Sequence, residues 1–454
     1  MGLKTWPVKE HRLGVLGLYE SGKTVLLTSL IDHLKYQEPD RFSLGKEGKA
    51  RIRKFQENEP DPGSDWERFR YARYRDALAH GQWPPDTSDR LQYACEFQRT
   101  DRNRWQRLKF YDFPGERIAD IGMYKCSYEA WSQNMIKRFE DDRRYRDRVG
   151  EYLNLQKEGD IEEGKVVYAY KKALARLACA YKPLISPSVF LLDVSGNHAS
   201  TGSVEEIAED RCAGLDEDRQ FAPLGKKCQE ENRKLSRTFA VRYDEYRKKI
   251  VRPWVKGLKK CHGLAVLVDV TMVLSGGTGM YDDNQALIRE LLRTLEPNDG
   301  LLLRNVKALS RQALPSLWCP GGISKIAFVA SKSDKVHPLD MDNYKNLMRT
   351  MVERDALDLD HVKTEYLTCS AAISTDVVEK HERTLCGFPA TNGDNGREAD
   401  EKQKFEVSKV PHDWPREWEP GEYSFPNVRP VMIDRKDYPP NHENLDKLFN
   451  FLTQ

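Results

Sequence analysis

Residues 17–24 read Gly-Leu-Tyr-Glu-Ser-Gly-Lys-Thr, and this stretch decides how the rest of the chain is interpreted. A short apolar run, 13–16, comes just before it, and residues 25–34 carry apolar side chains at helical spacing. A strand, a loop ending in Gly-Lys-Thr and a helix together form the pattern of a phosphate-binding loop. Glycines let backbone N–H groups curl around a phosphate at the positive end of the following helix. The stretch therefore predicts a nucleotide or phosphate site.

The side chains at the end of this loop have expected roles. Lys23 would reach the β- and γ-phosphates as a catalytic residue, and the Thr24 hydroxyl would ligate Mg²⁺. We expect Lys23 to be exposed to the ligand and not to the core. The alternative is a chance match in a turn, but the flanking strand and helix favour the functional interpretation. The residues predicted to surround the phosphates are Gly17, Leu18, Tyr19, Glu20, Ser21, Gly22, Lys23, Thr24 and Val25.

Composition limits the class of protein. The chain has 454 residues and a net charge of only +2, so no electrostatic footprint predicts a nucleic-acid partner. Its nine cysteines are scattered without a Cys-x-x-Cys pair, which favours a reducing compartment over a zinc site. The first seven residues do not have the apolar core of a signal peptide, and the most apolar later stretch, 263–276, is too short to span a bilayer. We expect a cytoplasmic protein without a transmembrane segment, and peripheral membrane contact through a partner stays open.

A second motif follows a predicted hairpin. Two strand-like runs, 91–99 and 107–113, are joined by a polar turn, and the second ends in Tyr-Asp-Phe-Pro-Gly-Glu. Asp112 can hold Mg²⁺ through water, and the Gly115 N–H can meet the γ-phosphate. Another Asp-x-x-Gly at 193–196 also follows an apolar run. The first copy is preferred because it lies after the phosphate loop in the order that small GTPases use.

Residues beside this hairpin complete the predicted switch. Thr87, just before the hairpin, is the candidate whose hydroxyl completes the Mg²⁺ shell in the catalytic site, with Ser88 as its rival. Glu116 follows the glycine and would position the attacking water, the alternative being a surface charge. Arg117 and Arg90 lie near the switches in sequence, but neither can be assigned as an arginine finger from sequence alone.

The base-recognition motif comes after a later strand. The apolar run 326–330 predicts a buried strand and leads into Ser331-Lys332-Ser333-Asp334, which is similar to the Asn/Thr-Lys-x-Asp guanine motif. The Asp334 carboxylate would accept hydrogen bonds from guanine N1–H and the 2-amine, with the Lys332 stem along the base. Parallel strands present ligand-binding residues at their carboxyl ends. The next strand ends at the segment expected to meet guanine O6, which is Ser370, Ala371 and Ala372.

The rest of the chain predicts additions to one nucleotide-binding domain. Amphipathic helices at 165–181 and 230–256 indicate a helical subdomain packed beside the nucleotide site. A buried strand at 263–269, a plain glycine-rich connection at 275–279 and a helix at 284–295 follow. The predicted G domain comprises 1–37, 83–122, 257–374 and 425–454, with a switch-proximal insertion at 38–82, a helical subdomain at 123–256 and a polar C-terminal excursion at 375–424.

On these residues the chain resembles the YcjX-like family of P-loop GTPases, a stress-associated bacterial group related to Ras-like and Gα-like proteins. Ser331 stands where the guanine motif has Thr or Asn. The segments that carry the resemblance are 16–25, Thr87, 111–116, 127–132, 246–253, 266–269 and 330–334.

The resemblance implies a fold and an activity. The expected fold is α/β: a P-loop G domain with a mostly parallel sheet flanked by helices and a helical insertion. The expected cofactors are GTP or GDP and Mg²⁺, with slow hydrolysis, a nucleotide-dependent switch, a role in stress and an unidentified protein partner or activator. Two alternatives stay open: a scaffold that binds nucleotide without hydrolysis, and an ATPase in which 331–334 is only a polar loop.

Overall fold

The structure divides into two compact units. One consists of Met1–Gly115 with Lys259–Gln454, and the other of Glu116–Leu258. The structure, a computed structural model, describes residues 8–18, 20–36, 40–45, 48–59, 66–85, 90–102, 104–180, 203–206, 208, 215–295, 322–356, 362–379, 382–390, 401–433 and 438–454.

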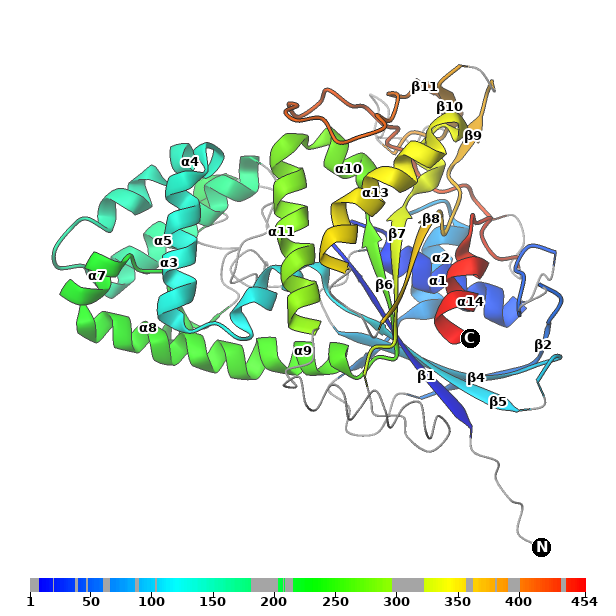
Figure 1. The fold of residues 1–454 in the computed structure, drawn as a ribbon, viewed down its shortest axis with the longest axis horizontal. Coiled ribbons are helices and arrows are strands. Elements are labelled where there is room, and N and C mark those ends of the chain that lie inside the picture. Colours follow the sequence, from blue (N-terminus) through cyan, green and yellow to red (C-terminus); the bar gives the residue numbers. More distant parts are fainter. Residues whose placement is uncertain are drawn as a thin grey trace, which may run out of the picture. The chain divides into compact units, whose positions relative to one another are not determined.

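The first unit is built on a mostly parallel sheet with the strand order β2-β4-β5-β1-β6-β7-β8 (Figure 1). Strand β1 lies between β5 and β6 and runs parallel to both, and β7 and β8 continue in parallel. β4 and β5 form the predicted antiparallel hairpin. The strands are β1 (Lys9–Gly17), β2 (Ile52–Asn58), β3 (Glu67–Arg68), β4 (Leu91–Arg99), β5 (Trp105–Asp112), β6 (Gly263–Val268), β7 (Lys325–Ser331) and β8 (Lys363–Cys369).

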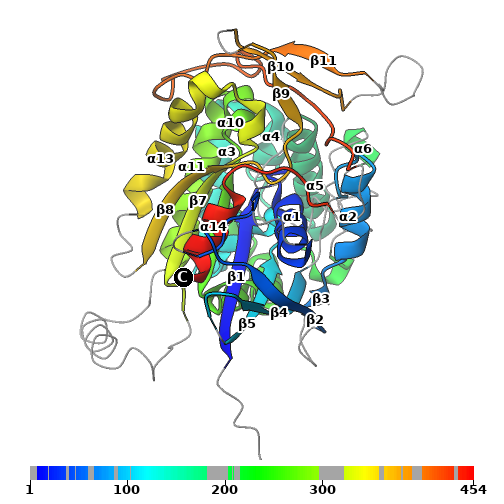
Figure 2. The ribbon, with the colours of Figure 1, turned by 90° about the vertical axis from the view of Figure 1, so that its right-hand side faces the viewer.

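Residues 38–82, expected as an insertion, contribute to this sheet. β2 pairs antiparallel with β4, and the short β3 pairs parallel with the start of β4. Figure 2 shows α2 next to α1, and the two helices are in contact. The helices of this unit are α1 (Lys23–Tyr36), α2 (Tyr71–Ala79), α10 (Val270–Ser275), α11 (Gly277–Leu295), α13 (Met341–Ala356) and α14 (Leu445–Thr453).

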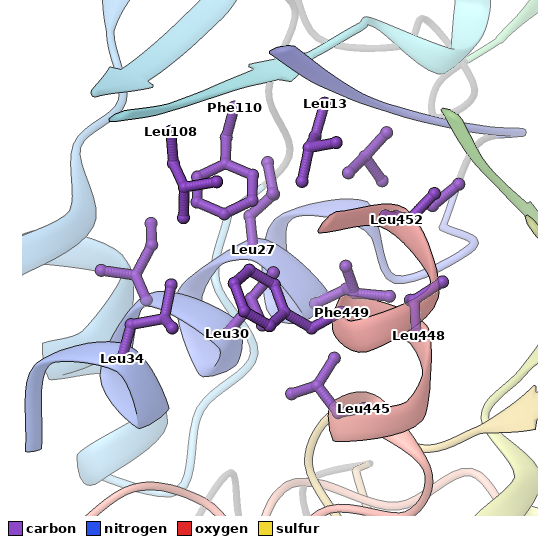
Figure 3. Packing of buried hydrophobic residues seen from close by; sticks show 14 of the residues in the cluster. Leu13, Leu27, Leu30, Leu34, Leu108, Phe110, Leu445, Leu448, Phe449 and Leu452 are labelled. Atoms are coloured by element: carbon purple, nitrogen blue, oxygen red, sulfur yellow. The ribbon is translucent and has the colours of Figure 1, made fainter. Parts of the chain in front are cut away.

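Helices cover both faces of the sheet. Alternate side chains of the strands, such as Leu13 on β1 and Phe110 on β5, pack against α1 and α14 in a buried hydrophobic cluster (Figure 3). Tyr366 on β8 points to the other face of the sheet, where α13 packs. The Arg349 guanidinium of α13 lies 5.7 Å from the centroid of the Tyr366 ring. The Tyr344 hydroxyl of α13 donates to the Ser331 carbonyl at 2.5 Å. Both faces of the central strands are therefore buried, as expected for a parallel sheet.

The predicted glycine-rich connection at 275–279 is wrong in part. Gly276 caps α10, and α11 begins at Gly277 rather than at residue 284. Gly277 has φ +81°, a conformation that glycine adopts without strain. A Cβ there would lie 2.9 Å from the Pro420 nitrogen, so the tight approach of another segment also requires glycine.

The second unit is helical and has its own core. Phe139, Tyr145, Tyr152 and Tyr170 are fully buried there. A π-helical turn at Arg247–Val251 precedes α9, whose second residue is a proline that cannot donate a backbone hydrogen bond. The unit's elements are η1 (Gly115–Met123), α3 (Tyr128–Asp141), α4 (Arg143–Leu155), α5 (Glu163–Ala180), α6 (Val204–Glu206), η4 (Glu217–Arg219), α7 (Lys226–Glu231), α8 (Arg233–Tyr246), η5 (Arg247–Val251) and α9 (Arg252–Lys259).

The remaining elements of the first unit are two short helical turns, η6 and η7, and three short strands, β9 to β11. A small antiparallel sheet forms within the segment expected as a polar excursion. Within the described part of the chain, no helix has the length and apolarity needed to cross a bilayer. The elements are η6 (Ser333–Lys335), η7 (Pro338–Asp340), β9 (Thr375–Val377), β10 (Thr384–Gly387) and β11 (Gln403–Glu406).

Candidate functional site

The predicted phosphate loop connects β1 to the first turn of α1. Gly22 has φ +91° and Glu20 φ +57°, so two left-handed residues curl the chain between strand and helix. The Ser21 N–H donates to the Leu18 carbonyl at 3.2 Å, and the Leu26 N–H donates to the Gly22 carbonyl at 2.9 Å. The loop therefore ends at a helix N-terminus, which favours anions through its dipole and its unpaired N–H groups.

Lys23 is buried rather than exposed as expected. Its side chain and backbone are only 8% exposed, and the Nζ atom donates to the Leu18 carbonyl at 3.1 Å. The Leu18 carbonyl belongs to the same loop, so the ammonium is bound by the backbone of its own loop. The charge of Lys23 therefore lies against the backbone of the loop that is predicted to bind phosphate.

Gly115 packs directly on this loop. A Cβ at Gly115 would lie 2.7 Å from the Gly17 oxygen and 2.8 Å from Lys23 Nζ. Real Cβ atoms do not approach that closely, so only glycine fits here without displacing the loop. The Asp-x-x-Gly motif and the phosphate loop, far apart in the sequence, thus meet at the carboxyl ends of β5 and β1.

A threonine hydroxyl and a buried carboxylate lie together beside the loop. Thr24 Oγ1 is 3.4 Å from Asp112 Oδ2, and Asp112 is fully buried at the end of β5. Ser21 Oγ is buried without a hydrogen-bond partner among the described residues. Hydroxyl and carboxylate oxygens are the ligands that Mg²⁺ prefers, so this donor set fits that ion.

The other predicted motif gathers around Asp334 at the ends of β7 and β8. The Ser370 hydroxyl donates to Asp334 Oδ1 at 2.7 Å. The Ser374 N–H and hydroxyl both donate to Oδ2, at 2.9 and 2.5 Å. Ala371 and Ala372 lie in the loop between these serines, and the loop is held by hydrogen bonds of Ser370 and Ile373 to residues 441–443.

Lys332 is paired with Asp269, a residue for which no role was predicted. Its Nζ atom lies 2.8 Å from Asp269 Oδ2, and its backbone has φ +58°. Burial alone would raise the pKa of Asp269, but the Lys332 ammonium and the Thr271 hydroxyl hold that pKa below its ordinary value. Burial alone would lower the pKa of Lys332, but Asp269 raises it. The pair is therefore ionised, and Asp269 fixes the position of the Lys332 head group.

Two functional candidates were missed for different reasons. A role for Asp269, which lies in the predicted strand segment 263–269, could have been inferred because the residue directly follows the buried parallel strand β6. Ser374 gave no sequence signal, since its contact with Asp334 spans forty residues and depends on how the loop folds back.

Several of the predicted site residues are not among those that the structure describes. Tyr19, Thr87, Ser88 and the second Asp-x-x-Gly at 193–196 lie outside the described residues. Glu116 lies in η1, directly after Gly115.

The two arginines considered as fingers have neighbours of their own. The Arg90 guanidinium lies 5.7 Å from the centroid of the Trp66 ring. Arg117 Nη1 lies 3.5 Å from the Tyr246 hydroxyl. Neither of these contacts is with a residue of the phosphate loop, so they do not identify either arginine as an arginine finger.

An α/β fold with a mostly parallel sheet, helices on both faces and a phosphate loop after β1 is the architecture of a P-loop G domain, so the predicted fold class is confirmed. The model of the YcjX-like family, DUF463, matches residues 11–454, and the chain belongs to this family. The chain is also similar to the Ras-like GTPase YcjX of Escherichia coli (strain K12). The identity is 23% over 493 aligned positions, which cover 97% of this chain and 94% of that protein.

Proposed function

We propose that this protein binds guanine nucleotide, hydrolyses GTP slowly with Mg²⁺ and acts as a nucleotide-dependent switch. The observation that carries the proposal is the convergence of two motif sets at the carboxyl edge of one parallel sheet. Lys23 and Gly115 meet at the ends of β1 and β5, and Asp334 and Ser370 meet at the ends of β7 and β8. The similarity to a protein named a Ras-like GTPase supports the same activity.

In this proposal the nucleotide lies across the strand ends. Backbone N–H groups of residues 17–25 and the Lys23 ammonium bind the phosphates. Asp334 accepts hydrogen bonds from the guanine edge, and the Lys332 stem, whose head group is held by Asp269, packs along the base. Residues 370–372 supply the backbone donor for guanine O6.

Mg²⁺ would be held by Thr24 and, through water, by Asp112, with Thr87 as the proposed third contributor. The ion would neutralise charge on the β- and γ-phosphates. The 3.4 Å distance between Thr24 Oγ1 and Asp112 Oδ2 supports this proposal.

Hydrolysis is expected to be slow. In this proposal Glu116 accepts a hydrogen bond from the attacking water, but a carboxylate so close to the γ-phosphate would be repelled by its negative charge. An arginine that neutralises the transition state contributes about 10³–10⁵ in rate, and neither Arg90 nor Arg117 is assigned to that role. We therefore propose intrinsic turnover well below about one per second, with a protein partner completing the site. A cytoplasmic stress-response role is part of the same proposal.

Binding is tested by thermal shift. Adding Mg·GDP to the wild-type protein should raise the melting temperature, and the increase should grow with ligand concentration. Lys23→Ala should lose that increase while melting cooperatively without ligand. An equal shift in Lys23→Ala would remove the phosphate loop from consideration.

Hydrolysis is tested in single-turnover experiments. Glu116→Ala should slow GTP hydrolysis and leave GDP affinity nearly unchanged, because the carboxylate is proposed to contact water and not the bound nucleotide. Thr87→Ala should slow hydrolysis as well. If both variants hydrolyse GTP at the wild-type rate, the protein is better described as a nucleotide-binding scaffold.

A further inference from the structure

The Asp334 carboxylate already receives three hydrogen bonds from the protein itself. Oδ1 accepts one, from the Ser370 hydroxyl, and Oδ2 accepts two, from the N–H and the hydroxyl of Ser374. A carboxylate offers about four acceptor positions, two on each oxygen. Within the described part of the chain, Oδ2 is therefore filled and Oδ1 has one position left.

Guanine would bring more donors than this carboxylate can accept. Its Watson–Crick edge presents N1–H and the 2-amino group, so two further hydrogen bonds must be accommodated. Three donors from the protein and two from the base exceed about four acceptor positions. One protein donor has to leave before both guanine contacts can form.

The Ser374 hydroxyl is the donor whose departure opens a position on Oδ2, because the Ser370 hydroxyl occupies only Oδ1 and the Ser374 N–H belongs to the backbone. The backbone around it is fixed, because the neighbouring Ile373 N–H donates to the Asn441 carbonyl at 2.8 Å and Ser370 is bridged to Glu443. The Thr375 hydroxyl donates to the Asp334 carbonyl and holds the far side of the loop. Rotating a serine about χ1 moves only its hydroxyl between staggered positions.

We propose that Ser374 is a specificity residue that competes with the guanine 2-amino group for Asp334 and so limits guanine-nucleotide affinity. This inference rests on the proposed function, since it concerns how the same site reads its base. The N–H of Ser374 stays on Oδ2 and keeps the carboxylate oriented, while the hydroxyl rotates away when guanine binds. Ser374 therefore acts through Asp334: its backbone N–H positions the carboxylate, and its hydroxyl competes with the base.

Inosine diphosphate separates competition from a merely structural role. Hypoxanthine carries N1–H but no 2-amino group, so the free position on Oδ1 is enough and the Ser374 hydroxyl can stay in place. Ser374→Ala should therefore bind GDP about threefold to tenfold more tightly than the wild type, the worth of one competing hydrogen bond. Its affinity for inosine diphosphate should change by less than about twofold on the same reasoning.

Matched variants make the measurement specific. Ser324→Ala removes a hydroxyl that donates to the His262 carbonyl at 3.1 Å just before β7, at the opposite end of that strand from Asp334, and should leave both affinities as in the wild type. Ser374→Cys keeps nearly the same volume but carries a weak donor, so it should repeat the alanine result if the alanine variant folds poorly. Thermal melting without nucleotide reports folding in each case.

The titrations use GDP, inosine diphosphate and ADP with the full chain. Selective tightening of GDP in Ser374→Ala or Ser374→Cys supports the proposal. Equal changes for GDP and inosine diphosphate, or weaker GDP binding, overturn it while the guanine-binding function stands. If the wild type binds ADP as tightly as GDP, the proposed function itself fails and the role of Ser374 fails with it.

Discussion

At the scale of single residues, close contacts decide which side chains the nucleotide site tolerates. The phosphate loop accepts Glu20 in a left-handed conformation but leaves no room for a Cβ at Gly115. The motif predicted the glycine as a γ-phosphate contact, and the structure adds that it packs against the loop backbone. A steric requirement and a predicted ligand contact therefore fall on the same residue.

Gly115→Ala should weaken nucleotide binding by about tenfold or more. The new methyl group would lie 2.9 Å from the Leu18 carbonyl carbon and even closer to the Gly17 oxygen, so the loop must shift. Calorimetric titration with GDP measures the effect. Gly150→Ala is the control, because no atom lies within 4 Å of its added Cβ and GDP affinity should not change. Wild-type affinity in Gly115→Ala would contradict the packing argument.

At the scale of elements, local patterns predicted the strands and helices that lie next to the site. The hairpin β4–β5 and the buried strands β6 and β7 follow from apolar runs ended by polar motifs. The pairing of β2 with β4 could not be predicted, because an edge contact across about forty residues has no local signature. The start of α11 was misplaced because glycines normally interrupt helices, whereas here Gly277 begins one against Pro420.

The C-terminal helix α14 is predicted to hold the sheet and α1 together. Phe449 is only 1% exposed, and its ring centroid lies 5.9 Å from that of Phe42 and 6.3 Å from that of Phe97. Phe449→Ala should reduce the free energy of unfolding by about 3–5 kcal/mol through lost burial and a cavity. Urea denaturation without nucleotide measures the loss. Lys447→Ala, on the exposed side of the same helix, should change stability by less than about 0.5 kcal/mol. A similar loss in both variants would argue against a core role for Phe449.

At the scale of the whole molecule, buried histidines predict sensitivity to acid. Burial lowers the pKa of His11 and of His33 to about 3, and for His33 the nearby His442 adds to the effect. In the unfolded chain these groups take up protons below about pH 6.5, whereas the folded protein leaves them neutral. Stability is therefore lost as the pH falls from about 6.5 toward 3, by about 1.4 kcal/mol per pH unit for each histidine.

His33→Phe isolates one of these contributions. Phenylalanine can keep the stacking on Phe42, where the His33 ring centroid lies 5.0 Å away, but it cannot be protonated. The loss of stability between pH 7.5 and 5.5 should be smaller in the variant by about 1.4 kcal/mol, measured by urea denaturation at both pH values. Burial raises the pKa of Asp32 to about 6, which acts in the opposite direction, so the difference between the two proteins is the quantity to compare. Identical pH dependence would show that His33 is not held neutral by the fold.

The position of the main motifs of the candidate site could be predicted from sequence, but several contacts of their side chains could not. The phosphate loop and the Lys332–Asp334 motif could be placed from sequence because strand order brings parallel strand ends to one edge. The Asp269 partner of Lys332 and the serines around Asp334 depend on tertiary packing, so only the structure reveals them. The predicted packing of the helical subdomain beside the nucleotide site stays a prediction.

The central claim is that Asp334 reads guanine, and titration of GDP and ADP into the wild type and Asp334→Asn tests it most directly. Two charge-assisted hydrogen bonds contribute about 1.5–3 kcal/mol each, so the wild type should prefer GDP by roughly a hundredfold or more. Asp334→Asn should lose that preference through weaker GDP binding, while ADP binding stays poor. Equal binding of GDP and ADP by the wild type would contradict the account.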